Sequence, residues 1–218
     1  MQTQAGAEGI VCALAGELGL WATRVRSRQQ VLGLEVLELD APRPARAVIC
    51  GIGKVAAARG VAALCHAGPA PLGRLWVVGT CGGLVASLPV GTLVHCTRAV
   101  QADLGVRAGR EVEADVRLRA AWQAVAPGPE AHFLTADRAV LSPLRRFRLT
   151  RAWPGPAVAD METAAAAAVA AGCGIPFAAL RAVTDRAGWF GGSTFRANYE
   201  TQGPRAADTL LPLWEKLV

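Results

Sequence analysis

Residues 160–185 read DMETAAAAAVAAGCGIPFAALRAVTD and decide the fold of this chain. Alanine is the strongest helix former, so the alanine run predicts a helix over 162–171. Two glycines follow this run and provide the usual C-terminal stop of a helix. The apolar run that comes next predicts a buried strand over 176–183. A helix that leads directly into a buried strand is the repeating unit of an α/β protein.

The rest of the chain alternates between apolar strand-like runs and helix-like segments in the same way. The expected strands are residues 9–14, 32–39, 46–50, 75–78, 92–96 and 132–134. The expected helices are residues 54–66, 116–125, an Arg-rich helix that starts at Pro143, and 205–217. This alternation predicts a single α/β domain over residues 1–218, with a mixed, largely parallel central sheet flanked by helices.

The composition points to a cytoplasmic protein. Of the 218 residues 52% are hydrophobic, yet no run of eighteen apolar residues occurs, and the first eight residues lack the basic region of a signal peptide. The six cysteines are scattered, which indicates free thiols in a reducing compartment. The three histidines are far apart, so we expect no metal site. Because no long apolar run occurs, we also expect no membrane partner.

The net charge of +6 raises the possibility of a nucleic-acid partner. However, 21 of the 23 basic residues are arginine, which is typical of a general compositional bias. The one dense cluster consists of Arg138, Arg145, Arg146, Arg148 and Arg151. We interpret this cluster as a solvated helical surface, with polyanion binding as the alternative, and expect no nucleic-acid partner.

A glycine pattern at Gly51-x-Gly53-x-x-Ala56 lies between an expected strand and an expected helix. It satisfies a relaxed dinucleotide-binding motif, which needs an acidic residue about twenty positions further on. No Asp or Glu occurs between Asp40 and Asp103, so NAD binding is not expected. Close packing of strand on helix is sufficient to explain the pattern.

A second glycine-rich segment, GTCGG at residues 79–83, follows an apolar run. Gly79 and Gly82 let the backbone approach a ligand, and the segment can present its N–H groups to it. A tight turn is the alternative interpretation. The predicted ligand segment also includes Thr80 and Cys81.

Carboxylates lie at both ends of residues 160–185. Asp160 and Glu162 precede the alanine helix, where they either compensate the helix dipole or form a polar site on a buried scaffold. Asp185 ends the following strand, where it either caps the next turn or acts as an acid. Partial burial is expected to raise the pKa of Asp185, which suits it to give a proton to a leaving group.

Three segments together resemble the nucleoside phosphorylase/nucleosidase superfamily, especially its 5′-methylthioadenosine/S-adenosylhomocysteine nucleosidase branch. They are residues 50–55 (CGIGKV), residues 79–84 (GTCGGL) with Val90-Gly91 downstream, and residues 160–185. The similarity extends from Gly9 to about Gly188. It implies a nucleoside phosphorylase-like fold, a small-molecule nucleoside substrate, no cofactor, and a homodimer.

The resemblance also implies roles for individual residues. Glu162 matches the carboxylate that binds the ribose hydroxyls, with Met161 packed against the sugar. Asp185 matches the acid that assists departure of the purine. Glu17 matches the carboxylate that activates the attacking water, and Thr80 matches a serine near that water. Carboxylates around the sugar suit a reaction that passes through a sugar cation.

Val140 and Phe177 are assigned to the region that receives the base. In the methylthioadenosine enzymes an aromatic residue stacks on the base at the position of Ala139, so this chain departs from the family pattern there. Trp189 or Phe190 are candidates to replace that aromatic ring.

Whether water or phosphate acts as the nucleophile is a further open question. Related hexameric phosphorylases hold phosphate with an arginine at the position of Val77, and this difference favours water, although Arg24, Arg26 or Arg28 could still reach an anion. We therefore expect hydrolysis of an adenosine-type nucleoside. A phosphate-dependent phosphorylase, a futalosine hydrolase, a hopanoid-associated phosphorylase-like enzyme and a non-catalytic nucleoside- or polyanion-binding protein remain alternatives.

Overall fold

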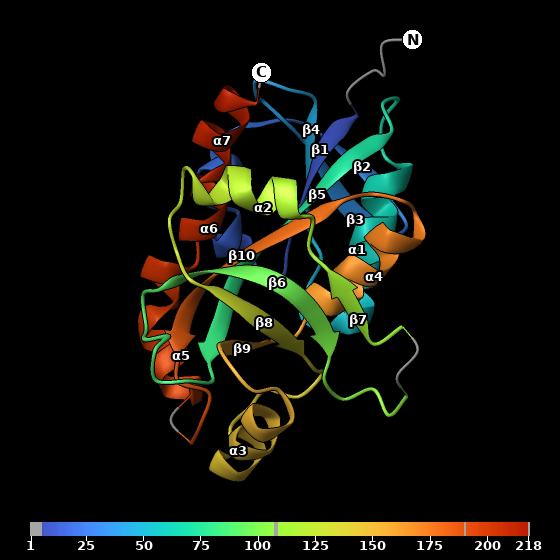
Figure 1. The fold of residues 1–218 in the computed structure, drawn as a ribbon. Helices are drawn as coiled ribbons and strands as arrows, with labels where there is room; N and C mark the ends of the chain where they lie inside the picture. Colours follow the sequence, from blue (N-terminus) through green and yellow to red (C-terminus); the bar gives the residue numbers. More distant parts are fainter. Residues whose placement is uncertain (1–5, 107–108, 190, 218) are drawn as a thin grey trace.

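The backbone of this chain is built around one large mixed sheet, seen in a computed structural model that describes residues 6–106, 109–189 and 191–217 (Figure 1). Its strands are β1 (Ala7–Cys12), β2 (Val25–Val31), β3 (Leu34–Leu39), β4 (Ala45–Ile49), β5 (Leu72–Gly83), β6 (Leu93–Gln101), β7 (Glu111–Glu113), β8 (Glu130–Thr135), β9 (Ala157–Asp160) and β10 (Phe177–Asp185). Its helices are the 3-10 helix η1 (Ala15–Thr23), α1 (Lys54–His66), α2 (Val116–Gln123), α3 (Pro143–Ala152), α4 (Thr163–Gly172), α5 (Gly191–Gln202), α6 (Arg205–Asp208) and α7 (Leu210–Lys216).

Part of the sheet closes on itself. β5 pairs with both β10 and β9, β9 pairs with β8, β8 pairs with β6, and β6 returns to β10, so these five strands form a closed ring. From β5 the sheet continues outward through β1, β4, β3 and β2. The prediction of a single α/β domain with a mixed sheet is confirmed. Parallel pairing joins β4, β1, β5 and β10, whereas the hairpin β2–β3 at the edge is antiparallel.

Helices cover both faces of the sheet, as expected. α1 and α4 lie together on one face, while α2, α6 and α7 lie on the other (Figure 1). Small side chains let α4 approach the sheet and α1 closely, because Ala164, Ala166 and Ala167 are almost completely buried in the core that these elements share. The second face is filled by indole rings, with Trp21 and Trp214 centred 4.8 Å apart. Two separate apolar cores therefore hold the sheet rigid from both sides.

Most elements that sequence reasoning missed are polar or very short, whereas the missed 3-10 helix η1 has nine residues and reads AGELGLWAT. β2 reads VRSRQQV and is an edge strand whose side chains mostly face solvent, so no apolar run indicates a strand there. β9 has only four residues. α5 has a mostly polar sequence, and the expected C-terminal helix is divided at Thr209 into α6 and α7. Among the described helices, none combines the length and apolarity needed to cross a bilayer.

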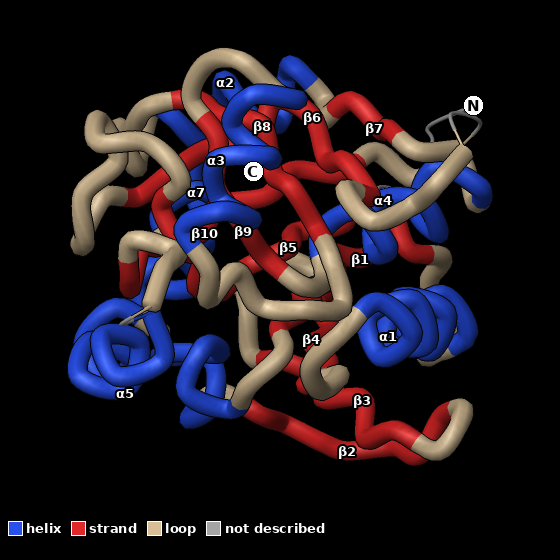
Figure 2. The backbone as a smooth tube through the Cα atoms, turned by 90° about the horizontal axis from the view of Figure 1, so that it is seen from below, coloured by secondary structure: helices blue, strands red, loops and turns tan. Residues whose placement is uncertain are grey.

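The ring and the parallel strands bring several carboxyl ends to the same side of the molecule. The segments that follow β1, β5, β8, β9 and β10 converge there (Figure 2). In open α/β sheets ligands bind in the crevice outside the carboxyl ends of the strands. This edge of the sheet is therefore the place to look for a functional site.

Candidate active site

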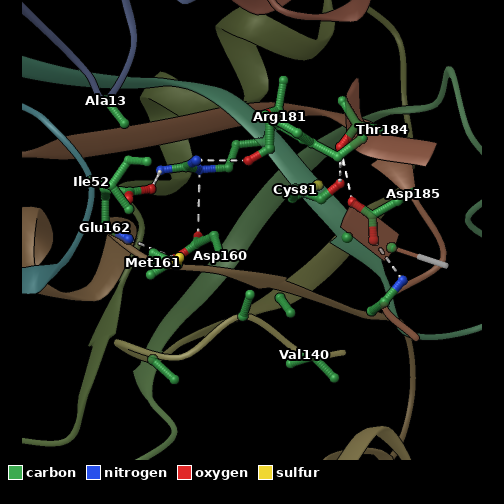
Figure 3. A pocket seen from close by; sticks show the side chains of 18 of the residues that line it. Ala13, Ile52, Cys81, Val140, Asp160, Met161, Glu162, Arg181, Thr184 and Asp185 are labelled. Carbon is green, nitrogen blue, oxygen red and sulfur yellow. Dashed lines mark hydrogen bonds and ion pairs between the residues drawn. The ribbon is translucent and has the colours of Figure 1, made fainter. Parts of the chain in front are cut away.

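A pocket of about 300 Å³ opens at the carboxyl ends of these strands. We call it the main pocket. It is lined by residues from β5, β9 and β10, by the loop after β8, by the segment after β1 and by α5 (Figure 3). Its carboxylate lining residues are Glu17, Asp160, Glu162 and Asp185. Most of the remaining lining is apolar, which is typical of a pocket for a small organic ligand.

Arg181 is the centre of a buried charge network behind this pocket (Figure 3). Only 2% of its side chain is exposed, and its guanidinium donates to Thr163 Oγ1 at 3.0 Å, to the Thr80 carbonyl at 2.8 Å and to Glu162 Oε2 at 3.1 Å. It also forms an ion pair with Asp160 Oδ2 at 3.4 Å. Burial by itself lowers the pKa of Arg181, but the two carboxylates more than offset that and raise it above its ordinary value. Sequence reasoning gave Arg181 no role, although an arginine inside a buried strand has to find carboxylate partners.

Asp160 and Glu162 divide the two roles that the sequence left open. Asp160 Oδ1 accepts from the backbone N–H groups of Glu162 and Thr163, both at 3.2 Å, and from Thr135 Oγ1 at 2.5 Å. It therefore caps the start of α4. Glu162 instead directs its carboxylate to Arg181 and to the backbone N–H of Gly53, at 3.0 Å, and lines the main pocket.

The Gly51-Ile52-Gly53 turn supports Glu162. Gly53 has a φ of +102°, a conformation that L side chains rarely adopt. The turn aims the Gly53 N–H at the carboxylate 109 positions away in the chain. Burial raises the pKa of Glu162, although Arg181 opposes this effect. The glycine pattern thus reflects more than the close packing that we expected from the sequence.

Glu17 is held more firmly than any other carboxylate of the pocket. Its Oε1 accepts from the N–H and the hydroxyl of Thr80, at 2.9 and 2.8 Å, and its Oε2 accepts from the N–H groups of Ala13 and Leu14, at 3.0 and 3.1 Å. Gly79, with a φ of +143°, lies directly behind it, since a Cβ there would stand 2.8 Å from Oε1. The GTCG segment is the end of β5 rather than a turn, and Thr80, Cys81 and Gly82 line the pocket while Gly79 makes room for Glu17.

Asp185 lies at the end of β10, in the part of the main pocket lined by Val140 (Figure 3). Its Oδ1 accepts from the Ala187 N–H at 2.8 Å and its Oδ2 from the Thr184 hydroxyl at 3.1 Å. Burial raises its pKa, against the effect of these two hydrogen bonds. The expected rise is confirmed.

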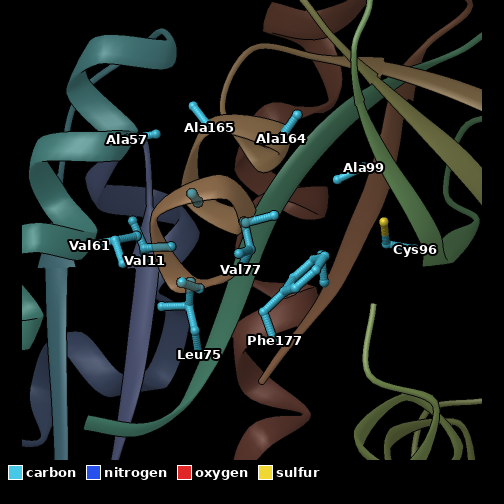
Figure 4. Packing of buried hydrophobic residues seen from close by; sticks show 14 of the residues in the cluster. Val11, Ala57, Val61, Leu75, Val77, Cys96, Ala99, Ala164, Ala165 and Phe177 are labelled. Atoms are coloured by element: carbon cyan, nitrogen blue, oxygen red, sulfur yellow. The ribbon is translucent and has the colours of Figure 1, made fainter. Parts of the chain in front are cut away.

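Two of the residues assigned to the base region are separated by the structure. Val140 lines the main pocket beside Ala139, whereas Phe177 does not and is packed in the core with Leu75 and Val77 (Figure 4). Phe177 begins β10 and Asp185 ends it. Eight residues of strand place the two about 26 Å apart, so the assignment of Phe177 was wrong.

The structure tests one of the two candidates for the missing aromatic ring. Trp189 is 76% exposed and is not part of the pocket lining, and Phe190 lies outside the described residues. Phe195 of α5 is the one aromatic residue among the described lining residues, and sequence reasoning missed it because α5 was not predicted. Its ring lies 5.2 Å from that of Tyr199.

The arginines of the β2 region do not reach the pocket. Arg26 and Arg28 pair with Asp40 and Glu35 at the exposed edge of the sheet, and Arg24 points to the Asp40 carbonyl. None of the three lines the main pocket. The expectation that they could hold an anion within this chain is wrong. Among the described residues, no group of three His, Cys, Asp or Glu side chains is placed to hold a metal ion.

The structure therefore combines a closed ring of strands with one pocket whose lining contains four carboxylates in mostly apolar surroundings. The chain belongs to the Phosphorylase superfamily, whose sequence profile matches residues 9–217. The structure is similar to that of S-adenosylhomocysteine nucleosidase from Streptococcus pyogenes in complex with 5-methylthiotubericidin, with a TM-score of 0.91, 25% identity and 100% of both chains covered.

Two further solved structures are similar in fold. 5′-Methylthioadenosine/S-adenosylhomocysteine nucleosidase from Helicobacter pylori has a TM-score of 0.90 at 20% identity, over 98% of this chain and 100% of that one. Futalosine hydrolase of Helicobacter pylori has a TM-score of 0.89 at 21% identity, over 97% of this chain and 98% of that one. A comparison with curated protein sequences found no match.

Proposed function

We propose that this protein hydrolyses the N-glycosidic bond of an adenosine-type nucleoside, such as 5′-methylthioadenosine or S-adenosylhomocysteine, and releases the free base. The observation that carries the proposal is the convergence of Glu17, Glu162 and Asp185 on one apolar pocket. Membership of the Phosphorylase superfamily and the likeness to the Streptococcus pyogenes nucleosidase support it.

Glu162 binds the ribose in this proposal. Arg181 and the Gly53 N–H occupy one position on each of its oxygens, so each oxygen keeps a second acceptor site for a sugar hydroxyl. Met161 packs beside it in the same lining. As the bond to the base breaks, positive charge develops on the sugar, and a fixed carboxylate in a water-poor pocket stabilises that charge.

Asp185 acts as the acid. Its raised pKa keeps a larger fraction of the side chain protonated near neutral pH than an ordinary aspartate has. A protonated carboxyl group can donate to a nitrogen of the departing base, so that the base leaves without a negative charge. Val140 and Phe195 supply the apolar walls against which a flat base can pack.

Glu17 and Thr80 act on water. The four hydrogen bonds that Glu17 accepts fill the capacity of a carboxylate, so a water molecule must replace one of them to be activated. Three of the donors are backbone N–H groups that cannot turn away. The Thr80 hydroxyl can rotate, so it is the donor that leaves Glu17 and turns to the attacking water, which it then holds against the carboxylate.

A futalosine hydrolase is a second candidate, because a solved enzyme of that kind has the same fold. Phosphorolysis is less well supported, since the three arginines considered as phosphate ligands lie away from the pocket. A binding protein without turnover has no need for three carboxylates in one pocket.

The proposal includes a cytoplasmic homodimer. All six cysteines are free, as in a reducing compartment. Large apolar side chains are exposed at the pocket, namely Ile52 and Leu141, which line it, and Phe147 on α3 is exposed as well. A second copy of the chain that covered these side chains would also close the pocket. Sedimentation analysis at micromolar concentration should give twice the chain mass, and a fully active monomer would contradict this part.

The test is release of free base from a panel of nucleosides, each with and without phosphate. The panel is 5′-methylthioadenosine, S-adenosylhomocysteine, adenosine, inosine and futalosine. Release without phosphate from an adenosine-type member supports the proposal. An Asp185→Asn variant should bind the same nucleoside without turning it over. Turnover at the wild-type rate in that variant would contradict the assignment of Asp185 as the acid.

A further inference from the structure

Three of the five clustered arginines, which the proposed function leaves unused, line a second cavity next to the main pocket. We call it the arginine cavity. It has a volume of about 560 Å³ and is open to solvent, and its polar lining residues are Asp103, Asp137, Arg138, Ser142, Arg145 and Arg148. Arg138 lines both this cavity and the main pocket. A ligand in the main pocket can therefore extend into the arginine cavity past Arg138.

The three arginines of this cavity have no partner among the residues that the structure describes. Within the described ranges, the guanidinium groups of Arg138, Arg145 and Arg148 make neither a hydrogen bond nor an ion pair, whereas their neighbour Arg146 donates to the Leu84 carbonyl at 2.8 Å. α3 contributes no fully buried residue to the fold, so packing does not explain the arginines that it carries. Unpaired arginines gathered in a concave site are the usual means of recognising carboxylate or phosphate.

The two aspartates of the cavity do not neutralise these arginines, because they are already engaged elsewhere. Lys54 Nζ lies 2.7 Å from Asp103 Oδ1 and 3.8 Å from Asp137 Oδ2. The second oxygen of Asp103 accepts from the Asp137 N–H at 3.0 Å, and Asp137 Oδ1 accepts from the Lys54 N–H at 2.9 Å. Three arginines and one lysine against two aspartates leave the cavity with a net positive charge.

We infer that the natural substrate is a nucleoside that carries a carboxylate, and that Arg138, Arg145 and Arg148 bind this group in the arginine cavity. The inference rests on the proposed function and specifies its substrate class. Arg138 stands at the junction and contacts the substrate where it leaves the main pocket. Arg145 and Arg148, one helical turn apart on α3, hold the anion itself.

The experiment compares matched nucleosides that differ in one charge. The pairs are futalosine with its methyl ester, and S-adenosylhomocysteine with its carboxamide. We expect the wild-type kcat/KM to favour the anionic member of at least one pair by tenfold or more, which is the size of one charge-assisted hydrogen bond. An Arg145→Gln/Arg148→Gln variant should lose that preference and keep its kcat/KM for the neutral member within about twofold.

Arg151→Gln is the matched control, since Arg151 is exposed on the same helix but outside the cavity. It should retain the preference for the anionic member. Added salt should weaken that preference in the wild type, because screening acts on the charged contact.

Several outcomes overturn the inference, and the first two of them leave the proposed function untouched. Equal kcat/KM for both members of each pair, or equal losses on both members in the double variant, would exclude an anion site for the substrate. Base release that requires inorganic phosphate, with the double variant raising the KM for phosphate, would assign the cavity to free phosphate instead. Release of no base from any nucleoside would instead contradict the proposed function, and binding of each pair by calorimetry would then decide the anion site alone.

Discussion

Replacing Arg181 with methionine should destabilise the fold far more than the loss of a surface ion pair. Methionine has a similar length, but it leaves the carboxylates of Asp160 and Glu162 without a cation, and these residues are only 7% and 5% exposed. Removing one partner of a buried ion pair costs about 3–5 kcal/mol, because the remaining charge stays buried and unpaired. This is a large part of the roughly 5–15 kcal/mol by which a domain of this kind is stable.

Urea denaturation at pH 7 measures this loss, with Arg26→Ala as the control. Arg26 pairs with Asp40 at the exposed edge of the sheet, so its replacement should cost less than about 1 kcal/mol. A second replacement, Glu162→Gln, should restore part of the stability of the Arg181→Met variant because it removes one of the unpaired charges.

The deficit should also depend on pH. Burial raises the pKa of Glu162 and Arg181 opposes that rise, so the pKa rises further in Arg181→Met. A carboxyl group whose pKa is raised by folding destabilises the protein once the pH exceeds its folded pKa, and this cost disappears below its unfolded pKa. The deficit should therefore be larger at pH 7 than at pH 4. A loss no greater than that of Arg26→Ala, at either pH, would refute this account of the network.

The other predictions concern activity. Asp185→Asn should lower kcat by a factor of about 100 or more, as expected for loss of a general acid, with little change in nucleoside binding measured by calorimetry. In the wild type kcat/KM should fall as the pH rises through the raised pKa of Asp185, because the protonated form of Asp185 is the active one. A kcat/KM that rises over the same pH range would contradict the role of Asp185 as the acid. Gly53→Ala should strain the turn by about 1–3 kcal/mol and raise KM by displacing the N–H that holds Glu162. An unchanged KM would show that this contact is dispensable. Thr80→Val keeps the backbone hydrogen bond to Glu17 but loses the hydroxyl, so kcat should fall while the melting temperature changes little. An unaltered kcat would exclude Thr80 from the activation of water.

Much of the fold could be predicted from local pattern. The helix over 54–66 has the bounds of α1, and the alanine run and its glycines mark α4 to within one residue. These elements have strong propensity and clear ends. β2 and α5 escaped because their sequences are polar and tertiary contacts alone define them.

The site could be predicted less completely. Carboxylates at strand ends could be recognised as candidate site residues, because a charged side chain in an apolar region indicates a partner or a function. The partners that orient them come from distant parts of the chain, such as Gly53 for Glu162 and Thr80 for Glu17, and no local pattern shows these pairs. Phe177 was wrongly assigned to the base region because it begins β10, whereas the pocket lies at the end of that strand.

The most direct test of the central claim is the identity of the sugar product. With the best nucleoside of the panel, the products formed with and without phosphate should be separated and identified by mass spectrometry, for the wild type and for Glu17→Gln. The account predicts free base and free sugar at the same rate in both conditions, and a rate lowered at least tenfold in Glu17→Gln. A sugar 1-phosphate formed only when phosphate is present, at a rate that Glu17→Gln leaves unchanged, would contradict it.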